Sequence, residues 1–197
     1  NGFPITEAQK KLNEILAISE KDYSQYLKHR KEEIVDFHLK NNPFYQDLVG
    51  KSTFEKWEAL PIMKKIDFQK PLVERLSKGY SEKNIYINKT SGSSGDPMVF
   101  AKDKFCHALI WANIMRRFNW YQMDYNHSFQ ARFYGMSLDV IPNKLLRLKD
   151  FLSNRYRMNI FDLSDAGLEK ITNHFRNKKF DYINGYTNSI VLLAKYL

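Results

Sequence analysis

The sequence contains one cysteine, Cys106, among its 197 residues, and it has no long apolar run. An intrachain disulfide is therefore excluded, as is typical of proteins in a reducing compartment. A membrane-spanning helix needs roughly 18–20 consecutive apolar residues, and no stretch of the sequence reaches that length. The first residues, NGFPITEAQKKLNEIL, also lack the continuous apolar region of a signal peptide. These absences predict a cytoplasmic protein with no membrane partner.

Acidic residues are comparatively scarce, because 22 Asp and Glu stand against 31 Lys and Arg, for a formal net charge of +9. The positive charges are scattered, and short basic segments such as KHRKEE are partly balanced. Such a surface either aids solubility or attracts an anionic ligand, such as nucleotide phosphates or a nucleic acid. The segment FLSNRYR, with Arg155 and Arg157, has no second basic aromatic stripe beside it, so we expect no nucleic-acid partner.

Residues 1–80 carry the spacing of helices rather than strands. Thr6 is expected to cap the first helix, and Tyr23, Tyr26 and Leu27 continue its helical spacing. A second helical run is expected over 31–40. Pro43 disfavours helix in the residue before it, so the second run should end there. Thr53 is then expected to cap a short helix, and a further short helix should follow the extended Leu-Pro-Ile segment.

From about Ser81 onward, short strand patterns alternate with helical ones. Strands are expected over 84–88, 97–103, 128–134, 157–163 and 179–183. Helices are expected over 105–118, after a Ser164 cap, and after a Thr187 cap that follows an Asn184–Gly185 turn. This alternation is typical of an α/β sheet. The predicted fold class is therefore α/β, with a helical N-terminal segment at 1–80 followed by a mixed α/β sheet subdomain at 81–197.

The loop between the first two expected strands concentrates two glycines and four hydroxyls in six residues, TSGSSG. Glycine accepts positive φ at little cost, so a run of such turns can point successive backbone N–H groups into one anion-binding concavity. Hydroxyl groups add short donors that reach phosphate oxygens. The candidate phosphate-binding residues are Thr90, Ser91, Gly92, Ser93, Ser94 and Gly95.

Three well-known loop motifs do not fit this stretch. A Walker A loop ends in Gly-Lys-[Ser/Thr], whereas Gly95 is followed by Asp96 and Pro97. The dinucleotide-binding fingerprint needs a third glycine and a helix directly after it. The nucleophile elbow of serine hydrolases needs a glycine at the position of Asp96 and a helix where a strand is expected.

The stretch TSGSSGDP does resemble the phosphate loop of the adenylate-forming superfamily, which includes acyl-CoA ligases. That loop typically reads [Ser/Thr]-Ser-Gly-[Ser/Thr]-[Ser/Thr]-Gly-x-Pro between two strands, and Asp96 stands where many members carry Lys or Thr. NNPFYQDL followed by WEALPIMKKIDF, and later KFDYINGYTNSIVLLAKYL, resemble segments of the phenylacetate–CoA ligase branch. That branch includes relatives in capsular polysaccharide biosynthesis, and the likeness spans nearly the whole chain.

The resemblance implies an AMP-forming ligase that uses ATP and Mg²⁺ to activate a small-molecule carboxylate, with coenzyme A as the expected thiol acceptor. It implies that Ser91 to Gly95 grip the β- and γ-phosphates as pyrophosphate departs. FYG corresponds to an aromatic-glycine stretch near the acyl pocket, and a Gly-Tyr pair precedes a later helix. Candidate substrate residues are therefore Tyr134, Gly135 and Tyr186. Relatives are often dimers, so a homodimer is also an expectation.

The sequence contains no counterpart of the family's Tyr-x-x-Thr-Glu motif, ribose-binding acid or catalytic lysine. The last expected helix also reaches Leu197 without a polar tail. We therefore expect the N-terminal part of a ligase, a truncated part of its N-terminal domain, that is not a competent ligase alone. No catalytic residue is assigned within it.

Two other functions remain open, a non-catalytic nucleotide- or anion-binding module and, ranked last, a basic nucleic-acid-binding protein. No metal site is expected, because metal-ligand spacing is lacking at His29, His38, His127 and His174. Cys106 and His107 are adjacent on an expected helix, where neighbouring side chains point about 100° apart. We therefore expect a packed helix face there rather than a catalytic pair.

Overall fold

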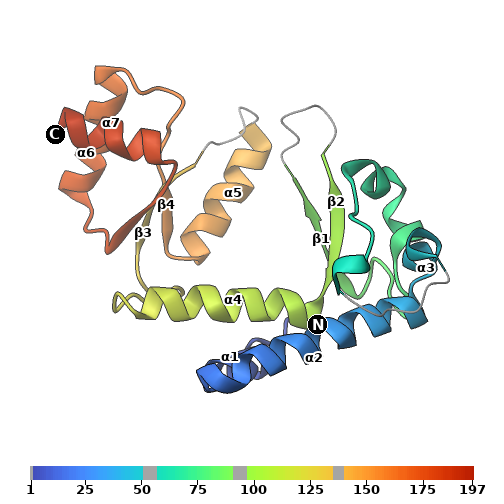
Figure 1. The fold of residues 1–197 in the computed structure, drawn as a ribbon. Helices are drawn as coiled ribbons and strands as arrows, with labels where there is room; N and C mark the ends of the chain where they lie inside the picture. The colour runs from blue at the N-terminus through green and yellow to red at the C-terminus, as the bar shows by residue number, and fades with distance from the viewer. Residues whose placement is uncertain (1, 51–56, 91–96, 135–139) are drawn as a thin grey trace. The chain divides into compact units, whose positions relative to one another are not determined.

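The computed structural model describes residues 2–50, 57–90, 97–134 and 140–197. The fold is mixed α/β, as predicted (Figure 1). The chain divides into two compact units, Asn1–Ile114 and Met115–Leu197, called the N-terminal and C-terminal units below. The domain boundary expected at residue 80 falls inside the N-terminal unit, which joins the helical segment to the first pair of strands.

Helices dominate the first part of the N-terminal unit: α1 (Ile5–Leu16), α2 (Glu20–Asn41) and α3 (Pro43–Val49), with short 3₁₀ turns η1 (Trp57–Ala59), η2 (Lys65–Gln69) and η3 (Leu72–Arg75). The predicted Thr6 cap is wrong, because α1 already begins at Ile5, directly after Pro4. Proline has a fixed φ that suits the start of a helix and lacks an N–H that would go unpaired there. Thr53 lies outside the described residues.

The second helix begins earlier than the sequence pattern indicated, at Glu20 rather than near residue 31, so Tyr23, Tyr26 and Leu27 are helical as expected but belong to α2 and not to the first helix. Pro43 does end α2, as predicted, and it is itself the first residue of the next helix, α3. Asn42 lies between the two helices, and its side-chain oxygen accepts a hydrogen bond from the Tyr45 N–H at 2.9 Å. A side-chain acceptor of this kind satisfies one of the unpaired N–H groups at a helix start.

The first two predicted strands are confirmed as β1 (Ile85–Lys89) and β2 (Val99–Asp103), which pair antiparallel. The helix α4 (Lys104–Asn119) follows β2 at once, also as predicted. Small residues let α1 and α4 approach closely, because Ala8 forms one buried cluster with Ala108 and Ala112. Partly buried apolar side chains surround this alanine cluster: Ile5, Leu12, Phe105 and Leu109.

The C-terminal unit is built on a parallel sheet in the order β4-β3-β5, from β3 (Gln130–Phe133), β4 (Arg155–Arg157) and β5 (Tyr182–Gly185). Its helices are α5 (Val140–Leu152), α6 (Asp165–Asn177) and α7 (Thr187–Tyr196) (Figure 1). One face of the sheet packs against α6 and α7 through the buried residues Ala131, Phe133, Met158, Leu168, Ile171 and Leu193. The opposite face contacts α5 through its Asp150.

Three expectations for this unit are corrected, while the Ser164 cap of α6 is confirmed. The strand expected over 157–163 is wrong, since β4 ends at Arg157. Beyond it the Asn159 and Asp162 side chains accept hydrogen bonds from backbone N–H groups two residues on, which favours turns over a ladder. The Asn184–Gly185 turn is also wrong, because both residues belong to β5.

The third correction concerns the start of the last helix. Thr187 is already the first residue of α7, and Tyr186 is the residue before it, without a side-chain cap. Gly185, the last residue of β5, runs very close to β3: a Cβ atom there would lie 2.3 Å from the carbonyl oxygen of Phe133. Only glycine therefore fits, and the reason is close backbone approach rather than a turn.

Candidate functional site

The glycine-rich loop begins and ends on two residues that hold each other across the β1–β2 hairpin. The Thr90 N–H donates to the carbonyl oxygen of Met98 at 3.0 Å, and the Met98 N–H donates to Thr90 Oγ1 at 2.8 Å. The last strand pair before this bridge is Lys89 with Val99. The loop therefore leaves and re-enters a hairpin with its two ends side by side.

The remaining predicted phosphate-binding residues, Ser91, Gly92, Ser93, Ser94 and Gly95, lie outside the described residues. Of the predicted set, the structure describes Thr90 alone. Thr90 is exposed, and its hydroxyl oxygen already accepts the Met98 N–H. Its own O–H proton can be donated to another acceptor, because a hydroxyl combines one donor with two acceptor lone pairs.

Two of the three predicted substrate residues lie together at the carboxyl ends of β3 and β5. The Tyr134 hydroxyl donates to Asn184 Oδ1 at 3.0 Å, and the Tyr134 and Tyr186 rings meet edge to face with centroids 5.1 Å apart. The Tyr186 N–H donates to the Phe133 carbonyl at 2.9 Å, and this bond fixes the position of the backbone that carries the Tyr186 ring. The third, Gly135, lies outside the described residues. In open α/β sheets, ligands bind beyond the carboxyl ends of the strands.

A row of arginines on the sheet beside these tyrosines was not predicted. The strand register places Arg132 of β3 next to Arg157 of β4. Arg155 lies two residues before Arg157 on the same strand, so the three side chains share one face, opposite the apolar core. Arg157 forms a buried bidentate ion pair with Asp150, at 2.8 and 3.1 Å. Arg155 donates to the Tyr125 hydroxyl at 2.6 Å.

Arg132 differs from both neighbours because, in the described part of the chain, its guanidinium has neither a carboxylate partner, as Arg157 has, nor a hydroxyl partner, as Arg155 has. It lies 4.9 Å from the centre of the Tyr134 ring, and its Nε is buried without a hydrogen-bond partner there. Burial, and then the charges of Arg157 and Arg155, lower the pKa of Arg132. The sequence held a usable signal, since the predicted inward alternation of Phe129, Ala131 and Phe133 leaves residues 130 and 132 on the other face.

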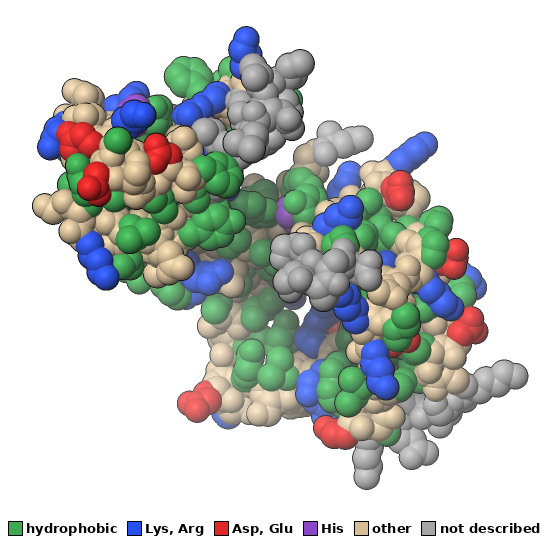
Figure 2. All heavy atoms as spheres, turned by 90° about the horizontal axis from the view of Figure 1, so that it is seen from above, with side chains coloured by type: hydrophobic (Ala, Val, Ile, Leu, Met, Phe, Trp, Pro, Cys, Tyr) green, Lys and Arg blue, Asp and Glu red, His purple; other side chains and the backbone are tan. Residues whose placement is uncertain are grey.

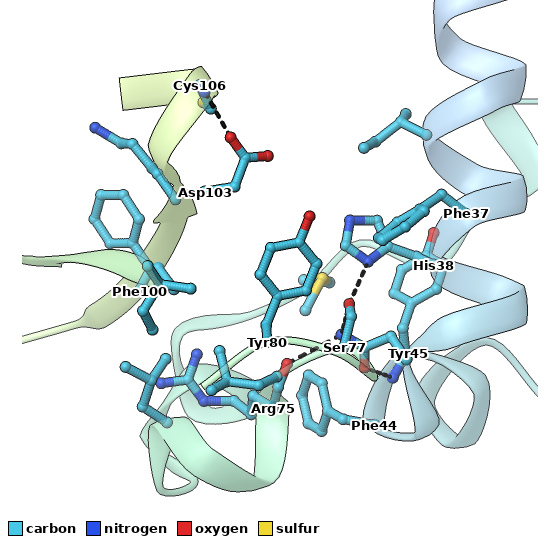
Figure 3. A pocket seen from close by; sticks show the side chains of 18 of the residues that line it. Phe37, His38, Phe44, Tyr45, Arg75, Ser77, Tyr80, Phe100, Asp103 and Cys106 are labelled. Carbon is cyan, nitrogen blue, oxygen red and sulfur yellow. Dashed lines mark hydrogen bonds between the residues drawn. The ribbon is translucent and has the colours of Figure 1, made fainter. Parts of the chain in front are cut away.

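A second feature that the sequence did not predict is a hollow in the N-terminal unit, with a volume of about 490 Å³ (Figure 3). Its walls come from α2, α3, the 3₁₀ turns and β2, between residues 34 and 106. Figure 3 shows aromatic rings on several sides of this space, with the Tyr80 hydroxyl projecting into it and Asp103 across from it. No local sequence pattern predicts this hollow, because the residues that line it are far apart in the sequence.

His107 is a packing residue, as predicted, and does not pair with Cys106. The His107 ring stacks on Tyr86 with centroids 3.6 Å apart, and its Nε2 accepts a hydrogen bond from the Trp111 indole N–H at 2.9 Å. Burial and the charge of Lys102 lower the pKa of His107, so the ring is neutral near pH 7. The exposed Cys106 donates its backbone N–H to Asp103 Oδ1 at 2.6 Å.

Basic side chains do not gather into one patch among the described residues on the face that Figure 2 shows. Figure 2 shows Lys and Arg interspersed with acidic and hydrophobic side chains on the visible face. Among the described residues, no group of three or more His, Cys, Asp or Glu side chains could hold a metal ion. In the same part of the chain, no helix combines the length and apolarity needed to cross a membrane.

Comparison with known proteins gives no independent assignment. No family model matches the sequence, and neither a curated protein nor a solved structure matches it.

Proposed function

We propose that this chain is the N-terminal part of an ATP-dependent acid–thiol ligase that activates a carboxylate as an acyl adenylate. The observation that carries the proposal is the hairpin: TSGSSGDP connects two antiparallel strands whose ends are bridged by Thr90 and Met98. This strand–loop–strand setting matches that of the phosphate loop that the sequence resembles. Backbone N–H groups and hydroxyls are the donors that polyphosphate binding needs.

The chemistry of the proposal divides into two transfers. A carboxylate oxygen attacks the α-phosphorus of ATP, the bond to the β-phosphate oxygen breaks, and pyrophosphate leaves. A thiol sulfur then attacks the acyl carbon, AMP leaves with the carboxylate oxygen, and the thiol proton passes to solvent. A loop that holds the β- and γ-phosphates acts by positioning and by stabilising the charge that builds on the leaving group. Mg²⁺ would enter with the nucleotide, and no step here depends on a protein metal site.

The second part of the proposal concerns the acyl substrate in the C-terminal unit. Tyr134 and Tyr186 offer two aromatic surfaces at the carboxyl ends of β3 and β5. Arg132, beside Tyr134, brings a positive charge without a carboxylate partner among the described residues. An aromatic or other apolar carboxylic acid would supply both the missing counter-charge and a surface for the rings.

Mg-ATP binding by the purified chain tests the phosphate loop, measured by isothermal titration calorimetry. Gly92→Val and Ser93→Ala are expected to weaken binding at least about tenfold, since a hydrogen bond to a charged group contributes roughly 1.5–3 kcal/mol. Ser81→Ala is the matched control, because Ser81 precedes β1 and is exposed. It should leave the Kd for Mg-ATP unchanged.

Three outcomes separate the proposal from its rivals. Pyrophosphate–ATP exchange that depends on an added carboxylic acid would support the ligase directly. Mg-ATP binding that depends on the loop but never supports exchange, even in the longest natural form of the protein, would favour the non-catalytic module. Undetectable Mg-ATP binding with tight duplex binding and a steep salt dependence would contradict the proposal in favour of a nucleic-acid-binding protein.

A further inference from the structure

The hollow of the N-terminal unit has the size and the lining of a ligand site. Its volume of about 490 Å³ lies within the roughly 300–1,000 Å³ of small-molecule pockets. Aromatic side chains line it from several elements, and all of them keep some exposed surface: Phe37, Phe44, Tyr45, Trp57, Phe68, Tyr80 and Phe100. The rings therefore surround an open space instead of closing into a filled core.

The charged groups in the wall are already engaged with protein atoms. Arg75 donates from Nε to the Lys70 carbonyl at 2.8 Å and from Nη2 to the Val99 carbonyl at 2.7 Å. Asp103 accepts the Cys106 N–H. Lys102 Nζ lies 5.5 Å from the centre of the Phe100 ring. An ionic guest would find no strong excess of either charge here.

Neutral polar groups form one end of the hollow. The Asn42 side chain donates to the Ser77 hydroxyl and to the Arg75 carbonyl, each at 3.0 Å, and Ser77 Oγ lies 3.5 Å from His38 Nδ1 (Figure 3). Burial lowers the pKa of His38, so its ring is neutral near pH 7. The Tyr80 hydroxyl adds a donor and acceptor inside the space.

We infer that this hollow binds an uncharged, largely aromatic or alicyclic small molecule with one hydroxyl or carbonyl group. The ring walls would stack on its apolar body, and the Tyr80 and His38 side chains would pair with its polar group. The inference goes beyond the proposed ligase function, because its residues are separate from the glycine-rich loop and from the Tyr134 cluster. It assigns the N-terminal unit a second ligand, distinct from the nucleotide.

The probe for the test is N-phenyl-1-naphthylamine, an uncharged aromatic compound that fluoresces more strongly in apolar surroundings. We expect saturable binding with one site per chain. Leu72 lines the hollow, whereas its neighbour Val73 does not and is 68% exposed. Leu72→Trp should fill the space and weaken binding at least about tenfold, and the matched Val73→Trp should leave the Kd unchanged. Circular dichroism of each variant verifies its folding.

Cys106 provides a second readout that needs no variant. It lines the hollow and is the chain's one cysteine, so alkylation reports on this position alone. The residue is exposed, but partial burial of its thiol, and then the charge of Asp103, raise the pKa of that thiol, so labelling with iodoacetamide should be slow enough to follow. At roughly ten times its Kd, the probe should slow alkylation about tenfold, in proportion to the unoccupied fraction.

Absence of saturable binding would overturn the inference, and so would binding that leaves the alkylation rate of Cys106 unchanged. The second result would mean that the probe coats exposed apolar surface elsewhere. Failure of the ligase proposal would give a different result. Gly92→Val should weaken Mg-ATP binding at least about tenfold and leave the affinity for N-phenyl-1-naphthylamine unchanged, so each binding measurement tests one proposal alone.

Discussion

The two units differ in which apolar side chains they bury. In the C-terminal unit, large side chains such as Phe133 and Met158 are almost fully buried between a parallel sheet and two helices. In the N-terminal unit, the buried apolar residues of the described part are small: three alanines and Val35. Its larger rings stand around a hollow instead. A tight core fixes one arrangement, whereas a wall of half-buried rings leaves room for a guest.

The largest expected effect contrasts one phenylalanine from each unit. Phe133→Ala should lower the free energy of unfolding of the C-terminal unit by about 3–5 kcal/mol, because it removes a fully buried ring and leaves a cavity. Phe44→Ala in the wall of the hollow should cost about 1 kcal/mol, since that ring is only partly buried. Hydrogen exchange followed by mass spectrometry would assign each loss to its unit. Equal losses of unfolding free energy for the two variants would contradict the difference in packing between the units.

The next effect tests the charged face of the C-terminal sheet. Asp150→Asn should destabilise this unit by about 3 kcal/mol, because it leaves Arg157 buried without a counter-charge. The matched control is Glu169→Gln, which removes an exposed ion pair with Arg176 and should cause no measurable change. Urea denaturation provides the measurement. An Asp150→Asn variant as stable as the control would show that the arginine row does not depend on this carboxylate.

The smallest effect concerns pH and the N-terminal unit. The pKa of His107 is lowered in the folded chain, so below about pH 6.5 the unfolded chain binds more protons and stability falls as pH decreases. Protonation at Nε2 would also break the hydrogen bond from Trp111. The melting temperature should therefore fall by a few degrees between pH 7 and pH 5. His107→Phe keeps a ring against Tyr86 and should reduce that dependence, while His38, whose pKa is also lowered by burial, should maintain the remainder. An unchanged slope would refute the contribution of His107.

Structural features that depend on residues close in the sequence could be predicted from sequence patterns. The β1–β2 hairpin was predictable because β-forming residues flank a glycine-rich loop on both sides, and the Ser164 cap because its hydroxyl serves the Gly167 N–H nearby. The break between α1 and α2 was missed, because Tyr23, Tyr26 and Leu27 continue the helical spacing of the first run. In the structure Ser19 precedes a new helix, and its hydroxyl donates to Asp22 Oδ2 at 2.5 Å.

Non-local contacts explain the remaining errors. The pair Asn184–Gly185 is typical of a turn, but in the structure Gly185 lacks a side chain because the backbone of β5 lies too close to Phe133 for one. The substrate pair Tyr134 and Tyr186 was reached only through a family resemblance, and the sheet register then brought the two rings together. The hollow arises from residues that meet only in the folded chain, so no window of the sequence contains it. Strand alternation places Arg132 on the polar face, but only the sheet register brings it beside Arg157.

The order β4-β3-β5 has a consequence for how the sheet associates. Within the described residues, β4 and β5 each pair with another strand on one side only, and the Arg157 carbonyl of β4 already accepts a hydrogen bond from Arg147 Nη1 at 3.0 Å. Charged side chains discourage another strand from adding at such an edge, and β4 carries Arg155 and Arg157. The β5 sequence, YING, carries no charge. Of the two edges in the described part of the chain, β5 is therefore the less protected against pairing with a further strand.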